Sequence, residues 1–152
     1  MSAVCTIGYE GATLDQWVET LSAAGVEVVV DVRDVPISRR KGFSKTALAA
    51  RLGAAGIDYV HIRALGNPRD LRHALKDGAI TFEQFAPVFR EQLSARGSDI
   101  ARVLELAESQ CVCLVCFEAD PATCHRSLVA ESLVAAAPQP LSVEHLSHAC
   151  RA

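Results

Sequence analysis

Short apolar segments of strand-like composition alternate along this chain with segments whose apolar residues recur at helical spacing. The predicted strands cover residues 4–9, 26–33, 57–62, 111–118 and 141–146. The run VEVVVDVR at 26–33 is rich in β-branched residues, which is typical of a strand buried on both faces. Alternating strands and helices with short connections predict a parallel sheet covered on both sides. We therefore expect an α/β fold, a three-layer α/β/α arrangement with a mostly parallel, Rossmann-like sheet of about five strands.

Capping signals mark the starts of two predicted helices. Thr13 and Gln16 have the spacing of a capping box, in which each side chain bonds the backbone of the other residue. Thr81 and Gln84 repeat this spacing. Pro87 conflicts with an uninterrupted helix after Thr81, because proline lacks the N–H that a helix interior uses.

Further helices are expected after Ser44 and over much of residues 69–108. The pair Asp120-Pro121 suits an N-cap followed by a first helical residue, so another helix is expected to begin there. With strands numbered along the chain, we favour the order 3-2-1-4-5. This order puts the first and fourth strands side by side at a switch point of the sheet.

Length and charge limit the classes of protein to consider. The chain has 152 residues and a net charge of -3. This length suits one hydrophobic core, so we expect a single α/β domain over residues 1–152. An acidic chain has no global field that attracts nucleic acid, so an anionic ligand would need a local basic cluster. No apolar run reaches the roughly 18 residues of a membrane span and no signal-peptide pattern opens the chain. We expect a cytoplasmic protein without a membrane partner.

Cysteine is frequent enough to raise the question of disulfides and metals. The cysteines are Cys5, Cys111, Cys113, Cys116, Cys124 and Cys150. We expect all of them to be reduced, because the chain is not small and shows no sign of secretion. The spacing of Cys113 and Cys116 resembles half of a zinc knuckle, but no second pair follows. Cys124 and His125 are also metal-ligand types, yet neighbouring residues on a helix diverge, so no metal site is predicted.

Unusual polar residues gather where the predicted strands end. The carboxyl ends of parallel strands meet at one edge of the sheet, where α/β proteins bind their ligands. The candidate residues are Tyr9, Asp31, Arg33, Ser38, Arg39, Cys116, Glu118, Cys124, His125 and Arg126. We expect them to line one site at this edge.

Part of this set suits binding of an anion. Arg33, Arg39 and Arg126 favour phosphate or carboxylate, because a guanidinium donates paired hydrogen bonds and stays charged. The expected helix start beside Arg126 adds unpaired backbone N–H groups. The predicted ligand-binding residues are Tyr9, Arg33, Ser38, Arg39, Cys116 and Arg126. We therefore expect a small anionic ligand.

The remaining residues suit catalysis. A cysteine near a helix start and near cations favours the thiolate, so Cys124 or Cys116 is the candidate nucleophile. Glu118, His125 or Asp31 would act as acid or base. Structural alternatives stay open: Asp31 can form an ion pair with Arg33, and Cys124 can be a structural thiol.

Four segments, in this order, resemble an uncharacterised family. They are TIGYEG, VDVRDVPISRRKGFSK, GIDYVHIRALGNPRD and LVCFEADPATCHRSLVAESL. Together they are similar to the family known as domain of unknown function 488, from Thr6 to about Leu146. The resemblance implies a bacterial or archaeal cytoplasmic protein and names no reaction.

A weaker similarity is to rhodanese sulfurtransferases and related phosphatases. The strand VVVDVR ends in Asp-x-Arg, and the later strand LVCFE is followed by a helix start with HRS. In those enzymes the catalytic cysteine and the arginine lie within one tight anion-binding loop. Here the segment FEADPATCH separates Cys116 from Arg126.

Three functions are open at this point. The first is an enzyme acting on a phosphorylated or nucleotide-like substrate, favoured by the arginines and by thiol, imidazole and carboxylate at one edge. The second is a module that binds a nucleotide or nucleic-acid end without chemistry, favoured by the basic loop at 38–41. The third is a sulfurtransferase or thiol redox protein, which needs a cysteine with a low pKa. The sequence names neither a cofactor nor an oligomeric state.

Overall fold

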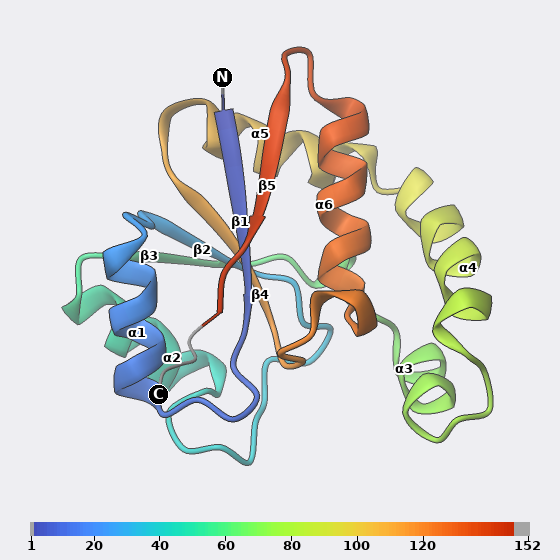
Figure 1. Cartoon of the computed structure of the whole chain (residues 1–152), viewed down its shortest axis with the longest axis horizontal. Coiled ribbons are helices and arrows are strands. Elements are labelled where there is room, and N and C mark those ends of the chain that lie inside the picture. Colours follow the sequence, from blue (N-terminus) through green and yellow to red (C-terminus); the bar gives the residue numbers. More distant parts are fainter. Residues whose placement is uncertain (1, 148–152) are drawn as a thin grey trace.

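The computed structural model describes residues 2–147, in which five parallel strands form one sheet between two layers of helices (Figure 1). The strands are β1 (Ser2–Gly8), β2 (Val28–Asp31), β3 (Asp58–His61), β4 (Val112–Cys116) and β5 (Leu141–His145). The α-helices are α1 (Leu14–Ala23), α2 (Lys45–Ala54), α3 (Arg69–Lys76), α4 (Phe82–Ser94), α5 (Gly97–Ser109) and α6 (His125–Ala136). Short 3-10 helices cover Arg63–Leu65 and Pro121–Thr123. The predicted three-layer α/β fold with a parallel sheet is confirmed.

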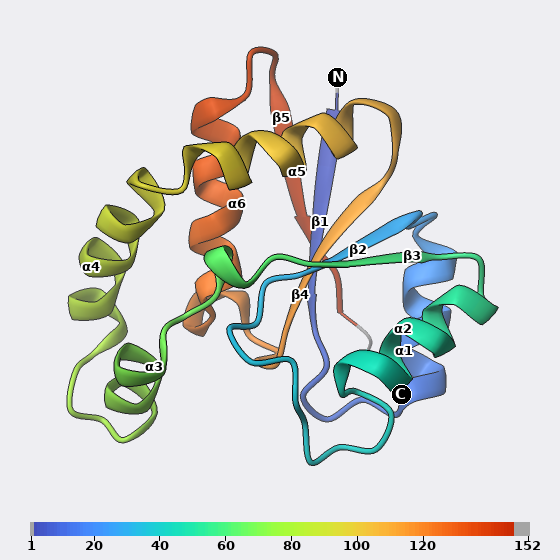
Figure 2. The same ribbon diagram turned by 180° about the vertical axis from the view of Figure 1, so that it is seen from behind.

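The two helical layers cover two separate hydrophobic cores. Successive residues of a strand point to opposite faces, so Val28 and Val30 of β2 join one core and Val29 joins the other. Helices α4, α5 and α6 pack on the first face, and α1 and α2 pack on the second (Figure 2). No helix within the described residues is both long and apolar enough to cross a bilayer. The single domain and the cytoplasmic location stay predictions.

The strand order is β3-β2-β4-β1-β5, so the predicted order 3-2-1-4-5 is wrong at its centre. The first and fourth strands are neighbours as expected, with Gly8 opposite Cys116. However, β4 lies between β1 and β2, whose Asp31 pairs with Val115. Both β1 and β4 are apolar, so their hydrophobicity does not determine which of the two is central. The observed order places Cys116 at the end of the central strand.

Helix starts were predicted more accurately than helix continuity. Both capping boxes are present, with Thr13 and Thr81 as the N-caps of α1 and α4. The expected interruption at Pro87 is wrong, because α4 continues through this residue. Pro87 and Glu83, whose carbonyl lacks the usual N–H partner, are both exposed, so water can satisfy that carbonyl. Phe89 and its apolar neighbours keep the helix on the core through its other face.

The segment between β4 and α6 differs from the expectation that a helix begins at Asp120-Pro121 and continues from there. Asp120 caps only the 3-10 helix Pro121–Thr123, through a hydrogen bond from Ala122 N–H to its Oδ1 at 2.9 Å. The chain then extends at Cys124, with φ -119° and ψ 139°, and α6 begins at His125. Cys124 is therefore the N-cap of α6 and not a residue within a helix.

Gly8 allows the end of β1 to approach the segment after β4. A Cβ atom at Gly8 would lie 1.8 Å from the carbonyl oxygen of Glu118. The backbone N–H groups of Tyr9 and Glu10 both donate to the carbonyl oxygen of Phe117, at 3.0 and 2.8 Å. These contacts join the carboxyl ends of two neighbouring strands.

We expect Gly8→Ala to lower the free energy of unfolding by more than about 3 kcal/mol, the upper end of ordinary overpacking, because the obstruction is backbone. Urea unfolding measures this change. The matched control is Gly53→Ala in α2, where an added Cβ has no neighbour within 4 Å. That variant should be neutral or more stable by up to about 1 kcal/mol. Equal unfolding free energies for Gly8→Ala and the parent chain would contradict the close approach.

Candidate functional site

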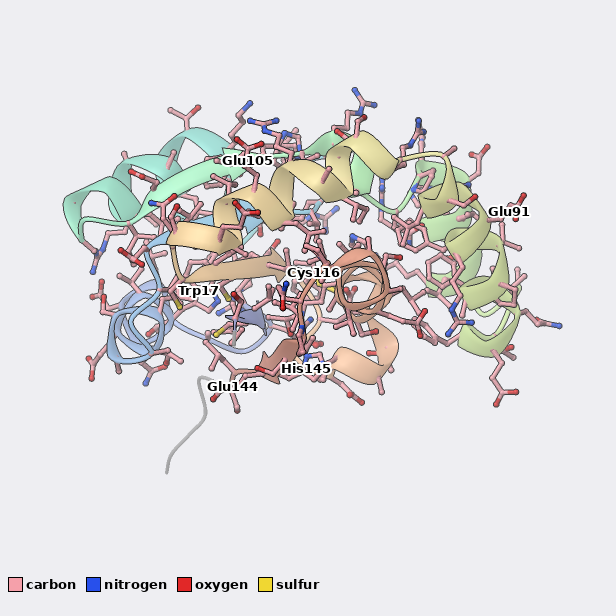
Figure 3. All side chains as sticks on the ribbon, turned by 90° about the horizontal axis from the view of Figure 1, so that it is seen from above. Trp17, Glu91, Glu105, Cys116, Glu144 and His145 are labelled. Carbon is pink, nitrogen blue, oxygen red and sulfur yellow. A yellow bond between two sulfur atoms is a disulfide. The ribbon has the colours of Figure 1, made fainter. Side chains whose placement is uncertain are left out.

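Most of the predicted site residues form two adjacent groups at the carboxyl end of the sheet. The Asp31 cluster consists of Tyr9, Asp31, Arg33, Phe43 and Tyr59. The cysteine cluster consists of Cys116, Cys124, His125 and Arg126, and Cys116 lies beside α6 near the middle of the molecule (Figure 3). A hydrogen bond links the two groups, because His125 bonds the carbonyl of Val32, between Asp31 and Arg33.

The Asp31 cluster is built on a buried ion pair. Arg33 Nη2 lies 2.7 Å from Asp31 Oδ2, and Arg33 Nε lies 2.9 Å from Asp31 Oδ1. Asp31 is 0% exposed and Arg33 is 6% exposed. The hydroxyl of Tyr59 donates to Asp31 Oδ2 at 2.5 Å, and burial together with this bond raises the pKa of Tyr59. The ion pair left open as an alternative in the sequence is confirmed.

The other donors of Arg33 also point into the protein. Its Nη1 donates to the hydroxyl of Tyr9 at 3.2 Å and to the carbonyl of Phe43 at 2.7 Å. The rings of Tyr9 and Phe43 stack with centroids 4.5 Å apart. Burial alone would lower the pKa of Arg33, but the hydrogen bonds and charge of Asp31 raise it above its ordinary value. These contacts favour a role in anchoring the loop before α2 over a role in binding a ligand.

In the cysteine cluster, the sulfur atoms of Cys116 and Cys124 are bonded. The expectation that all cysteines are reduced is wrong for this pair. The residues are 8 apart in sequence, and the 3-10 helix between them returns the chain to the end of β4. Cys5, Cys111 and Cys113 are free thiols, while Cys150 lies outside the described residues.

Arg126 is a fully buried cation, with an exposed fraction of 0%. Its Nε donates to Thr6 Oγ1 at 3.1 Å and its Nη1 to Cys116 Sγ at 3.2 Å. The guanidinium also donates to the carbonyls of Glu118 and Ala119. Within residues 2–147 it forms no ion pair with a carboxylate. Burial therefore lowers the pKa of Arg126, and the sulfur of Cys116 is the contacting group that can become an anion.

His125 is buried in one defined tautomer. Its Nε2 lies 2.6 Å from the carbonyl oxygen of Val32. A carbonyl only accepts hydrogen bonds, so Nε2 must carry the proton. Burial lowers the pKa of His125 to about 4, which leaves the ring neutral at pH 7. Its Nδ1 then keeps a lone pair and lies 3.8 Å from Cys124 Sγ.

Both sulfur atoms lie where negative charge is stabilised. Cys124 is the N-cap of α6 and accepts the backbone N–H of Arg126 at 3.5 Å. A helix N-terminus favours a thiolate through its free N–H groups and its dipole. Cys116 accepts from the guanidinium described above and lies 3.7 Å from Glu118 Oε1. Burial raises the pKa of Glu118, which makes its carboxylate a stronger base than an exposed one.

Three atoms of this cluster are of types that bind metals. The two sulfur atoms and a ring nitrogen of His125 all lie within 4.8 Å of one another. Sequence reasoning placed Cys124 and His125 on one helix, where their side chains would diverge. The extended backbone of Cys124 removes that premise.

Glu118 contacts the cysteine cluster through Cys116, whereas the two remaining predicted residues lie outside both clusters. Ser38 bonds within its own loop, to Ser44 Oγ through its N–H and to the N–H of Arg40 through its hydroxyl. Arg39 is exposed. Sequence reasoning also missed Thr6 and Tyr59, although Thr6 is a polar residue within an apolar strand.

Comparison with known proteins identifies a family but no activity. The sequence model of a family described as "Domain of unknown function DUF488" matches residues 13–133. No curated protein matches the chain. No solved structure matches it either, and the similarity to rhodaneses is not shown.

Asp31→Asn should lower the free energy of unfolding by about 3–5 kcal/mol, because it leaves the buried charge of Arg33 without its partner. Chemical denaturation of the two proteins gives this difference. Asp15→Asn is the matched control, since Asp15 is 90% exposed in its pair with Arg51 and should contribute less than about 1 kcal/mol. Similar small losses in both variants would show that the Asp31 pair does not stabilise the fold.

Proposed function

The chain belongs to the DUF488 family, whose function is unknown, and we propose that it is a thiol–disulfide redox protein. In this proposal Cys116 and Cys124 alternate between two thiols and one disulfide. The observation that carries it is the meeting of these two sulfur atoms at the junction of β4 and α6. The site lies at the carboxyl end of a parallel sheet, where α/β proteins place their reactive groups.

The surroundings of the sulfur atoms support this proposal. Redox exchange begins with a thiolate, because the thiol itself is a poor nucleophile. Cys116 accepts a hydrogen bond from a guanidinium, and Cys124 accepts one from the first turn of a helix. By contrast, burial raises the pKa of the free thiol of Cys5 to about 11. Within the described residues, the Cys116–Cys124 pair is thus the better candidate for reaction.

We assign the oxidant to the class of hydroperoxides. The Cys124 thiolate attacks one peroxide oxygen, the O–O bond breaks, and the departing oxygen takes up a proton. The resulting sulfenic acid is attacked by the Cys116 thiolate, which forms the S–S bond and releases the second oxygen as water. Hydrogen peroxide is thereby reduced to two water molecules, while two thiols become one disulfide. Glu118, beside Cys116, is placed to accept the proton of that thiol.

A dithiol returns the site to its reduced state. One thiolate of the dithiol attacks a sulfur of the pair to give a mixed disulfide, and its second thiolate then releases the protein. Both cysteines are 1% exposed, so this exchange requires a local opening of the structure around the sulfur atoms. Small reagents should therefore react faster than bulky ones.

The other two functions have less support from the same contacts. Arg33 and Arg126 direct most of their donors to groups within the protein. An anionic substrate would have to compete with those partners. A phosphorylated substrate and binding of a nucleic-acid end therefore stay predictions that rest on the sequence.

After reduction and removal of the reductant, hydrogen peroxide should decrease the mass of the chain by two hydrogen atoms. Peptide mapping should place the new disulfide between Cys116 and Cys124. Cys124→Ser should prevent this disulfide, and Cys111→Ser should leave it unchanged. The proposal fails if Cys116 and Cys124 of the folded parent chain both remain thiols after peroxide treatment. It also fails if Cys124→Ser loses two hydrogen atoms equally well by forming a disulfide between other cysteines.

A further inference from the structure

We propose that the reduced chain binds one thiophilic divalent cation, such as zinc, through Cys116 Sγ, Cys124 Sγ and His125 Nδ1. This inference concerns the same cysteines and rests on the proposed function only for the existence of their dithiol state. The ligand of the dithiol state would be a thiophilic cation, and His125 would lie beside the two cysteines because it is the third ligand.

The spacing of the donor atoms suits a single ion. Zinc bonds of about 2.0–2.3 Å in tetrahedral geometry place neighbouring ligand atoms roughly 3.3–3.8 Å apart. The three donor atoms lie within 4.8 Å of one another, and Cys124 Sγ is 3.8 Å from His125 Nδ1. Breaking the S–S bond frees the two sulfur atoms to move apart to the separation that a shared ion requires.

The backbone leaves room for this separation. The Cα atoms of Cys116 and Cys124 are 7.5 Å apart. Directly bonded cysteines usually have Cα atoms about 4.4–6.8 Å apart. The wider spacing suits two sulfur atoms that hold an ion between them, with the ends of β4 and α6 where they are.

His125 has the orientation of a metal ligand. A histidine that binds a metal through one ring nitrogen usually donates its other N–H to a carboxylate or a backbone carbonyl. Nε2 of His125 makes this bond to the carbonyl of Val32 at 2.6 Å, which fixes the ring and directs Nδ1 toward the sulfur atoms. Because that carbonyl belongs to the chain just after β2, the sheet itself orients the ligand.

The charges of the cluster also fit a bound cation. Two thiolates neutralise a divalent ion, and Arg126 can keep its N–H contact with Cys116 Sγ as an outer hydrogen bond. All three ligand residues are buried, which limits competition from water. Three protein ligands leave a fourth position for water or a small ligand, as in catalytic zinc sites.

The remaining free thiols provide an internal comparison. Cys5 and Cys113 are buried free thiols, and Cys111 interacts with Cys5. Burial raises the pKa of both Cys5 and Cys113, which keeps these thiols protonated and makes them poor ligands. Cys111 precedes β4, at the end of the strand opposite to Cys116, so a metal at the proposed site should be independent of Cys111.

Titration of the reduced, metal-free chain with cobalt(II) tests the inference, because cobalt reports its ligands in its absorption spectrum. We expect one equivalent to bind, with a thiolate-to-cobalt charge-transfer band and the intense visible bands of a four-coordinate site. Cys116→Ser and Cys124→Ser should each weaken binding by more than the roughly 10–100-fold caused by losing an outer partner. Cys111→Ser should bind as the parent chain does.

Alkylation mapping of the parent chain avoids dependence on variants that fail to fold. Zinc should protect Cys116 and Cys124 from iodoacetamide and leave the labelling of Cys111 unchanged. The inference is overturned if the reduced chain with cobalt(II) shows no thiolate charge-transfer band. It is also overturned if zinc protects Cys111 and leaves Cys116 and Cys124 open to iodoacetamide. Disulfide formation by peroxide is measured separately without metal, so failure to bind cobalt and failure of the redox function are distinguishable.

Discussion

The burial of the Arg126 guanidinium is the constraint on which the junction between β4 and α6 depends. A buried guanidinium must donate its N–H groups to acceptors on all sides, and the carbonyls of Glu118 and Ala119 can accept from it only if the chain turns back after β4. Thr6 of β1 contributes a third contact from the neighbouring strand. The same guanidinium thus holds the segment after β4, the start of α6 and β1 together. Cys116 and Cys124 meet because they lie at the two ends of the segment that it organises.

Assembly of the cysteine cluster also requires the carboxyl ends of neighbouring strands to approach closely, and the sheet allows this. Gly8 lets β1 contact the backbone of Glu118, and the central position of β4 brings Cys116 next to β1 on one side and β2 on the other. The carbonyl of Val32, just beyond β2, can then reach His125. Thr6 of β1 and Val32 just beyond β2 therefore each supply a contact to the cysteine cluster, and β4 supplies Cys116 itself. A different strand order would separate the partner of His125 from the cysteines.

Periodicity and capping patterns predicted the layers of the fold, because they depend on local sequence. Thr13 and Thr81 marked helix starts for that reason. The order of β1 and β4 was not predictable in this way, since both strands are apolar and the choice depends on packing across the sheet. The continuation of α4 through Pro87 depended on which face of that helix is exposed.

The candidate site likewise has features that the sequence predicted and features that it did not. Its position at the strand ends followed from the topology of parallel sheets, and the pairing of Asp31 with Arg33 was open as an alternative. The relation of Cys124 to Cys116 and His125 was not visible, because it requires the extended backbone of Cys124 before α6. The carbonyl partners of Arg126 were also hidden, since backbone carbonyls carry no sequence signal.

The two proposals are linked by one electrostatic requirement. Within the described residues, the contacts of Arg126 are to a hydroxyl, to carbonyls and to the sulfur of Cys116. A disulfide is neutral, whereas a thiolate supplies the negative charge that a buried cation requires. Under the redox proposal Arg126 would therefore stabilise the reduced state relative to the oxidised one, and a divalent ion bound by both thiolates would stabilise that state further through its bonds to the two sulfur atoms. Under the two proposals, oxidation has to overcome both effects, so the pair would respond to strong oxidants and would release its metal on forming the disulfide.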